Sequence, residues 1–388
     1  MIPQVAFRRS FFRYTRAAIG AVVGISLVAC GDDGIVTPIP QAPLGILVLD
    51  GFIQPGLTFL GDTGTASTKL AFGPSTEFDA GGFTLERDTV LATSSRSAGD
   101  LLYITDLTSN SVRRIQLPAR GNPGRARLFR GSNGQAQIAV ALRDSSAIAL
   151  VNVAGAAAPT ITRIANAGQC PSDMFQYDNA TWVVDANASC RTNYALLGNV
   201  RLIRIPNTGT TRDTIQLPAL RSSGASAIII NDVAYITAGG DANFSVSPFV
   251  LNVSGAVARV DLRGRRVLST QSMPTGTYGA SMKRGLDGFL YVSIFQDLAN
   301  FRSRIVKMRP EDLSFVGGTV NPWLPLTDAT GAAVSCGSGQ ADALGRVHCI
   351  QNGTGSVTSL LVFTPTGTEV RRVRAGQGGV DMAIRGRR

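Results

Sequence analysis

The chain has 388 residues, of which 44% are hydrophobic and only 16% charged, a composition that excludes intrinsic disorder for most of its length. That length allows one large all-β domain or two to three ordinary domains. The formal net charge of +11 raises the question of a nucleic-acid partner, whereas the single histidine, His348, argues against histidine-based metal sites and leaves any Ser-His-Asp mechanism dependent on one residue.

Residues 1–29 have the organisation of a bacterial export signal. They contain four arginines and no acidic residue, and their apolar stretch, residues 17–29, is too short to span about 30 Å of hydrocarbon. The stretch ends in Leu27-Val28-Ala29-Cys30, which resembles the bacterial lipobox. This resemblance implies that Cys30 receives a diacylglycerol thioether and becomes the acylated N-terminus after cleavage. The alternative is a secretory signal without lipidation, followed by a chance cysteine.

A second export feature overlaps the first. Arg8-Arg9, followed by Phe11 and Arg13, resembles a twin-arginine motif, although an ordinary arginine-rich signal for the general secretory route explains it equally well. Residues 30–44 contain three prolines and are predicted to form an extended, lipidated tether. We therefore expect an exported lipoprotein, anchored in the membrane through Cys30 at the periplasmic face or in the outer membrane.

Removal of the signal changes the charge argument. It leaves 33 basic residues against 26 acidic residues, a net charge of +7, and only three of the basic residues are lysines. The arginines are scattered and form no basic patch with interleaved aromatic residues. The sequence therefore predicts no nucleic-acid partner.

Residues 45–388 consist of short apolar or alternating runs separated by Gly, Asn, Asp and Pro turns. Four such runs recur at intervals of 43 to 57 residues, a pattern typical of β-propeller blades. The seven expected first strands contain Gly82, Arg127, Asp173, Ser226, Ser281, Ser338 and Asp381. The predicted fold is an all-β, seven-bladed β-propeller of four-stranded blades, with two packed β-sandwiches as the alternative.

The last of these first strands predicts how the ring closes. No further strands follow Asp381, but segments 45–53, 56–60 and 68–72 offer three partners, so N- and C-terminal strands would share one blade. The fourth strands of the other blades are expected at 112–117, 160–164, 213–217, 267–272, 314–320 and 369–374.

The third-strand pattern carries a family resemblance. Leu102-Tyr103-Ile104-Thr105-Asp106, followed by Ser109-Asn110-Ser111-Val112, resembles the repeats of YVTN-type and NHL-like propellers. The resemblance covers roughly residues 45–388, but no copy carries a complete YVTN motif. It implies the same propeller architecture and identifies no ligand.

Four cysteines besides Cys30 predict two disulfides in an exported chain. Cys170 pairs naturally with Cys190, because antiparallel strands return the end of the second strand to the start of the first. The second pair would be Cys336–Cys349. The strand register places Cys349 short of Cys336, and we favour this pair only because a pairing across blades would require a longer reach. Zinc ligation is the alternative, but no CxxC spacing supports it.

Three long loops fall on one face of the predicted propeller, where loops enter the first strands and join the second strands to the third. They are residues 186–199, 239–255 and 296–303, and they mix aromatic and polar side chains in a way that suits recognition. The alternative is that they only pad this face. The candidate ligand-binding residues on them are Arg191, Tyr194, Asp241, Asn243, Phe244, Phe249, Phe301 and Arg302.

Asp173 and Asp381 occupy equivalent repeat positions near the expected channel, where paired carboxylates could bind a cation such as calcium. A turn-capping role is the alternative, and His348 is expected to be a half-buried strand histidine. We expect no cofactor other than this calcium candidate. The predicted function is a lipid-anchored binding module whose channel face takes a protein or small-molecule ligand. The alternative is an envelope hydrolase or lactonase with a cation in the channel.

Overall fold

The computed structural model describes residues 45–386 with gaps, all within the second of two compact units, Pro40–Arg388. The gaps are residues 52, 62–66, 76–77, 97–98, 132–133, 154–158, 165, 208–211, 244–245, 247–248, 298–301 and 353–356. The export signal, Cys30 and the tether therefore lie outside the described residues. The described ranges contain no α-helix, and hence none that could cross a membrane.

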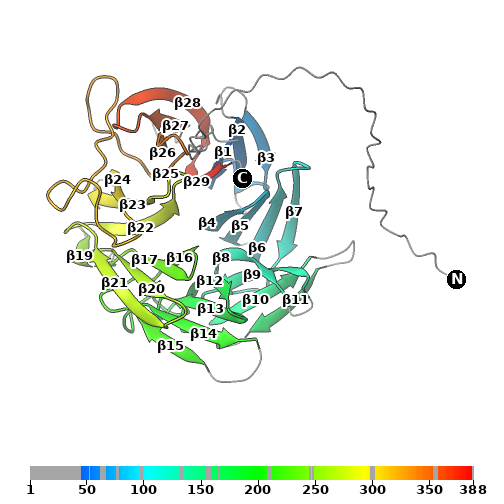
Figure 1. Cartoon of the computed structure of the whole chain (residues 1–388). Coiled ribbons are helices and arrows are strands. Elements are labelled where there is room, and N and C mark those ends of the chain that lie inside the picture. Colours follow the sequence, from blue (N-terminus) through cyan, green and yellow to red (C-terminus); the bar gives the residue numbers. More distant parts are fainter. Residues whose placement is uncertain are drawn as a thin grey trace, which may run out of the picture. The chain divides into compact units, whose positions relative to one another are not determined.

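Seven antiparallel sheets are arranged as blades around a common axis (Figure 1). Each innermost strand contacts the innermost strand of the next blade, from β4 through β29 and back to β4, so the ring is closed. The innermost strands are β4 (Ala80–Glu86), β8 (Pro123–Arg130), β12 (Pro171–Tyr177), β16 (Ala225–Ile230), β22 (Tyr278–Arg284), β25 (Ser338–Ala341) and β29 (Gly379–Arg385). All seven predicted first strands are among them, and the predicted seven-bladed β-propeller is confirmed.

The outer strands follow in order from the axis. The second strands are β5 (Thr89–Arg96), β9 (Ala136–Leu142), β13 (Ala180–Asp185), β17 (Val233–Ala238), β23 (Leu290–Asp297), β26 (Val347–Asn352) and β1 (Gly45–Asp50). The third strands are β6 (Gly99–Asp106), β10 (Ala147–Asn152), β14 (Arg201–Pro206), β20 (Ala256–Asp261), β24 (Arg302–Met308), β27 (Val357–Phe363) and β2 (Gly56–Gly61). The fourth strands are β7 (Ser111–Gln116), β11 (Thr160–Ile164), β15 (Asp213–Gln216), β21 (Arg266–Ser272), β28 (Glu369–Gln377) and β3 (Ser67–Ala71).

Seven apolar clusters hold the ring together, one at each interface between neighbouring blades. Successive side chains of a strand point to opposite faces of its sheet, so each strand contributes to two interfaces. In β13, Trp182 and Val184 pack toward the following blade, whereas Val183 packs toward the preceding one. This two-sided burial explains why the second strands read as continuous apolar runs.

The ring closes between the chain termini as the sequence predicts. β29 pairs antiparallel with β1, with Leu47 opposite Ala383 and Gly45 opposite Arg385, and β2 and β3 complete this blade. The closing blade therefore has its innermost strand from the C-terminal end of the chain and three strands from the N-terminal part. No sheet edge is left open between the first and last blades.

The blade that begins at β22 differs from its prediction, because the strand expected at 314–320 does not form. The described sheet has three strands, β22, β23 and β24, and the following segment pairs with β24 in isolated bridges at Phe315 and Trp323. Gly318 adopts a φ of +75° and closes a turn by donating its N–H to the Phe315 carbonyl. This turn interrupts the run that the apolar pattern suggested.

Strand direction gives the propeller two distinct faces. The hairpin face carries the turns between first and second strands, such as Arg87-Asp88, Asp178-Asn179 and Asn231-Asp232. The loop face carries the starts of the first strands and the connections between second and third strands, including loops 186–199 and 239–255. β1 begins at the hairpin face, since Gly45 lies opposite Arg385, the last residue of β29.

Both predicted disulfides are present. Cys170, which precedes β12, is bonded to Cys190 in loop 186–199, and their Cα atoms are 5.5 Å apart. Cys336, which precedes β25, is bonded to Cys349 of β26 across a Cα separation of 5.7 Å. Cys349 lies opposite Gly339 in the strand register, so the bond reaches back from the strand to the segment before it.

Candidate functional site

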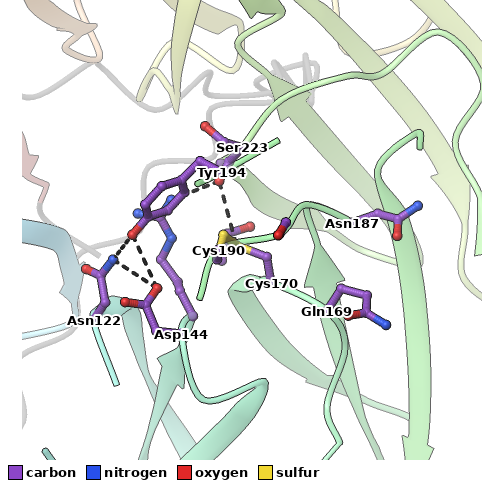
Figure 2. Close-up of a disulfide and its surroundings, with 12 residues drawn as sticks. Asn122, Asp144, Gln169, Cys170, Asn187, Cys190, Tyr194 and Ser223 are labelled. Atoms are coloured by element: carbon purple, nitrogen blue, oxygen red, sulfur yellow. Dashed lines mark hydrogen bonds between the residues drawn. A yellow bond between two sulfur atoms is a disulfide. The ribbon is translucent and has the colours of Figure 1, made fainter. Parts of the chain in front are cut away.

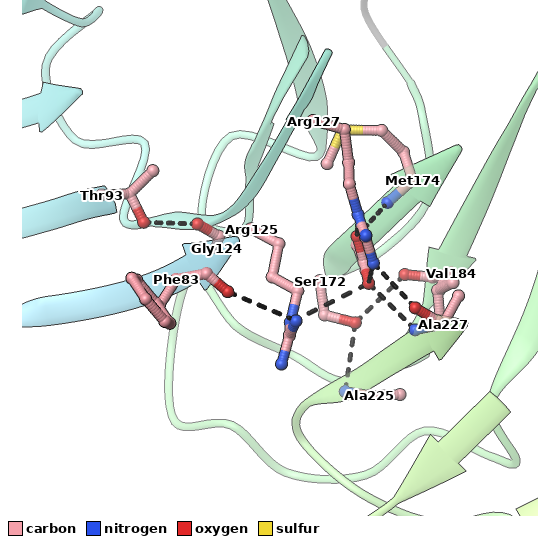
Figure 3. A network of polar contacts seen from close by, with 11 residues as sticks. Phe83, Thr93, Gly124, Arg125, Arg127, Ser172, Met174, Val184, Ala225 and Ala227 are labelled. Atoms are coloured by element: carbon pink, nitrogen blue, oxygen red, sulfur yellow. Dashed lines mark hydrogen bonds and ion pairs between the residues drawn. The ribbon is translucent and has the colours of Figure 1, made fainter. Parts of the chain in front are cut away.

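Asp173 forms the centre of a polar network at the axis. The side chain is fully buried, and Arg127 of β8 binds it through two hydrogen bonds, Nε to Oδ1 at 3.0 Å and Nη2 to Oδ2 at 2.8 Å. Asp173 also accepts the N–H groups of Met174 and Ala227, so one carboxylate joins β8, β12 and β16 (Figure 3). Burial alone would raise the pKa of Asp173, but the Arg127 and Arg125 guanidinium groups outweigh it and lower that pKa.

Asp381 plays the same part on the opposite side of the ring. Its Oδ1 accepts hydrogen bonds from Lys283 Nζ at 2.8 Å and from Ser338 Oγ at 2.7 Å, which joins β22, β25 and β29. Burial opposes ionisation here too, but the charges of Lys283 and Arg125 lower the pKa of Asp381. Arg125 therefore contributes to the lowered pKa of both aspartates.

These partners bear on the predicted cation site. Both carboxylates are bound by protein cations, so a metal ion would have to displace Arg127 or Lys283. Within the described ranges, no group of three or more His, Cys, Asp or Glu side chains is placed to hold a metal ion. The calcium candidate stays a prediction, with no ligand cluster in these ranges to support it.

Loop 186–199 is held on the loop face by its disulfide and by the contacts of Tyr194. The Tyr194 hydroxyl donates to Asp144 Oδ1 at 3.2 Å and accepts a hydrogen bond from Asn122, while the Arg143 guanidinium lies 5.2 Å from the ring centroid. Figure 2 shows this contact beside the Cys170–Cys190 bond. The predicted ligand residue Tyr194 therefore holds the loop that follows β13 against the neighbouring blade, which begins at β8.

Within the described residues, no contact links Arg191 or Asp241 to Tyr194. Arg191 is exposed, and its side chain has no partner among the residues that the structure describes. Asp241 lies in β18 (Asp241–Asn243), which pairs with β19 (Val250–Val253), and it accepts a hydrogen bond from Asn252 at 3.3 Å.

The remaining predicted loop residues divide into described and undescribed positions. Asn243 ends β18, Phe249 precedes β19, and the exposed Arg302 begins β24. Phe244 and Phe301 lie outside the described residues. No described contact shows these residues forming one pocket.

His348 is more deeply buried than the half-buried strand position expected for it. It lies in β26 at 3% exposure, and its Nε2 is 2.9 Å from Asp342 Oδ2. The same Asp342 oxygen accepts Arg346 Nε at 2.7 Å. Burial opposes the charge on Asp342, but the hydrogen bond and charge of His348, together with those of Arg346, lower its pKa. The histidine therefore belongs to a hydrogen-bonded cluster around the buried Asp342, at the hairpin between β25 and β26.

A cavity that the sequence did not predict lies on the opposite face from the long loops. It has a volume of about 840 Å³ and is lined at the hairpin ends of β4, β8, β12 and β16. Its lining includes three arginines, Arg87, Arg127 and Arg130, and one carboxylate, Glu86. Burial raises the pKa of Glu86, against the opposing charge of Arg127.

The comparisons with known proteins show a fold and no family. No family model and no curated protein matches the chain. Among solved structures, a protein from Lactobacillus plantarum aligns with a TM-score of 0.56 at 12% identity, over 88% of this chain and 99% of that one. Candidate 6-phosphogluconolactonases from Bacteroides uniformis and Bacteroides fragilis align with TM-scores of 0.55 and 0.51 at 12% and 13% identity. These two alignments cover 89% of this chain and 100% and 98% of the others, and at such identities the likeness shows the propeller fold alone.

Proposed function

We propose that the protein is a lipid-anchored β-propeller of the cell envelope that binds a protein partner through its loop face, without catalysing a reaction. The observation that carries this proposal is that exposed apolar side chains lie on the connections between second and third strands in three blades, all on the loop face. These side chains are Ile53, Tyr194, Leu197, Val246 and Val250. Apolar side chains presented on a rigid scaffold are typical of protein-binding surfaces.

The course of the chain is compatible with this proposal. The predicted lipid is carried by Cys30, and the chain enters the propeller at Gly45 on the hairpin face. The predicted tether is therefore attached at the face opposite the long loops and leaves those loops free for a partner.

The hydrolase alternative has less support. The candidate 6-phosphogluconolactonases share only the fold with this chain at 12% and 13% identity. The carboxylates nearest the axis, Asp173 and Asp381, are bound by Arg127 and Lys283. A cation-dependent reaction at the axis would first require these ion pairs to open.

Two variants of the loop face test the proposal. Leu197→Asp and Val250→Asp place a charge on side chains that are 59% and 50% exposed, so neither should disturb folding. After chemical cross-linking of intact cells, we expect these variants to lose a complex that the natural protein and the control Val320→Asp retain. Val320 is 99% exposed and lies outside the loop face. Equal complexes from all four proteins would contradict the proposal.

The anchor is tested separately. Cys30→Ser should move the protein from the membrane fraction to the soluble fraction of the envelope, because no lipid can then be attached. A Cys30→Ser protein that stays in the membrane fraction would contradict the lipid anchor. The replacement of Arg8 and Arg9 by lysine decides the export route, since unchanged export would exclude the twin-arginine pathway.

A further inference from the structure

The cavity on the hairpin face combines an apolar wall with a basic rim. Its walls come from Leu128 and Phe129 of β8, Phe175 of β12, and Ile228 and Ile229 of β16. Its volume of about 840 Å³ falls within the range of small-molecule sites. The cavity can therefore hold a ligand with an apolar body.

The charged groups of this cavity are mostly cationic. Arg127 is bound to Asp173 at the axial side, so its charge is balanced. Arg87 and Arg130 have no acidic partner among the described residues. Asp88, the neighbour of Arg87, is bound instead by Arg385. The single lining carboxylate, Glu86, accepts the Leu128 N–H at 3.2 Å. Two guanidinium groups are thus available to an anion.

Arg87 occupies a backbone conformation that arginine seldom adopts. It is the first residue of a two-residue hairpin turn and has a φ of +59°. The equivalent turns of two other blades place Asp178 and Asn231 at this position, with φ values of +48° and +55°. Asp and Asn tolerate the left-handed region, whereas a long side chain there is uncommon. The arginine therefore has no evident advantage for the turn itself.

The backbone of Arg130 is fixed by Gln176 of β12. The side chain of Gln176 accepts the Arg130 N–H at 2.7 Å and donates to the Arg130 carbonyl at 2.8 Å. This double hydrogen bond fixes the end of β8 against β12 and leaves the guanidinium out of the contact. The Cα position of Arg130 is therefore fixed, while its guanidinium group takes no part in this contact.

We propose that this cavity binds an amphiphilic anion, a carboxylate or phosphate monoester carried on an apolar chain. Arg87 and Arg130 bind the anionic head, since guanidinium groups pair with either oxyanion through two parallel hydrogen bonds. The apolar body packs against Leu128, Phe129 and the side chains from β12 and β16. This site is on the opposite face from the partner-binding surface and does not depend on it.

Calorimetric titration of residues 40–388 tests the site. This unit has a closed ring and its own apolar clusters, so it can be studied without the preceding residues and without detergent. The probes are decanoate and decyl phosphate, with decanol as the neutral match and acetate and inorganic phosphate as heads without a chain. We expect at least one decyl anion to bind at least tenfold more tightly than decanol and than its own isolated head. The ratio of the two decyl affinities shows whether the site prefers a carboxylate or a phosphate.

Three variants make the result specific. Arg87→Asn places in this turn a residue that the equivalent turn already carries, and Arg130→Gln leaves the backbone contact with Gln176 intact. Each should weaken decyl-anion binding at least fivefold while thermal unfolding is unchanged or, for Arg87→Asn, shifted to higher temperature. Arg191→Gln, on the loop face, should bind as the natural protein does. Absence of binding, equal binding of decanol, or unchanged affinity in both Arg87→Asn and Arg130→Gln would overturn the proposal.

Discussion

Arg127 of β8 binds Asp173 of β12 through two parallel hydrogen bonds, and these residues stand 46 positions apart in neighbouring repeats. The carboxylate is fully buried, and Arg127 also donates to the Ala227 carbonyl of β16 at 2.7 Å. Together with Asp381 and Lys283, this pair ties the innermost strands together around the axis. These charged residues therefore connect the innermost strands of different blades.

Removing one partner of this pair should destabilise the propeller. Arg127→Gln leaves the Asp173 carboxylate buried with its main counter-charge lost, which we expect to lower the free energy of unfolding by about 3 kcal/mol. Urea unfolding at neutral pH measures the change. Arg263→Gln, which removes an exposed partner of Asp232, is the control and should leave the stability unchanged. Equal effects of the two substitutions would contradict the role assigned to Arg127.

Glu86→Gln should stabilise the protein in a pH-dependent way. Burial raises the folded-state pKa of Glu86 above its ordinary value of 4.5, although Arg127 opposes the shift and Asp173 adds to it. A raised pKa means that the contribution of Glu86 to stability is complete below pH 4.5 and declines as the pH rises through the folded value. Glutamine keeps an acceptor for the Leu128 N–H and does not ionise.

The measurement is urea unfolding of both proteins between pH 4 and pH 8. We expect the advantage of Glu86→Gln to be largest at pH 8 and to diminish toward pH 4. An advantage of equal size at every pH would show that the ionisation of Glu86 is not its cause. Asp106→Asn serves as the control, because Asp106 is exposed and its pKa is lowered, mainly by hydrogen bonds from the N–H groups of Thr108 and Ser109.

The Cys170–Cys190 bond should stabilise the fold and also position Tyr194. With a sequence separation of 20, its loss in Cys170→Ser/Cys190→Ser is expected to lower the free energy of unfolding by about 3 kcal/mol. Cys336→Ser/Cys349→Ser, with a separation of 13, is the matched control and should be destabilised by a similar amount. Only the first variant should increase the amide hydrogen exchange of residues 189–197. Equal hydrogen exchange of residues 189–197 in both variants would contradict the claim that the Cys170–Cys190 bond orders this loop.

Closure of the ring predicts that the last strand is indispensable. A chain that ends at Gln377 lacks β29, which pairs with β1 and carries Asp381. We expect this truncation to abolish cooperative thermal unfolding, since β1 becomes an open edge and two apolar clusters lose members. Removal of residues 387–388 alone is the control and should not change the unfolding temperature. A cooperative transition at the natural temperature in the shorter chain would contradict the closure.

Much of the architecture could be predicted because each blade repeats a local pattern. The seven first strands, the shared closing blade and the Cys170–Cys190 bond follow from turns, apolar runs and cysteine positions that the sequence displays directly. The Cys336–Cys349 bond was predicted only because the other pairings would need a longer reach. The failure at 314–320 has a local cause, since the turn at Gly317 and Gly318 breaks an otherwise apolar segment. Apolar content alone does not distinguish a strand from such a turn.

The axial ion pairs and the hairpin-face cavity could not be predicted in the same way. Arg127 contacts Asp173, and Lys283 contacts Asp381, only when the blades are assembled. The sequence of one repeat does not determine how its first strand is positioned against the first strand of another blade. The cavity likewise collects residues from four blades. One signal was present in the sequence: Arg87 stands in a turn where the repeats offer Asp178 and Asn231.

The most direct test of the binding function places a photoreactive amino acid at Leu197 or at Val320 of the full chain in living cells. Leu197 lies on the loop face, whereas Val320 is 99% exposed and lies outside it. After irradiation, we predict a discrete protein adduct from position 197 and none from position 320. No adduct from position 197, or the same adducts from both positions, would contradict the loop face as the partner-binding surface.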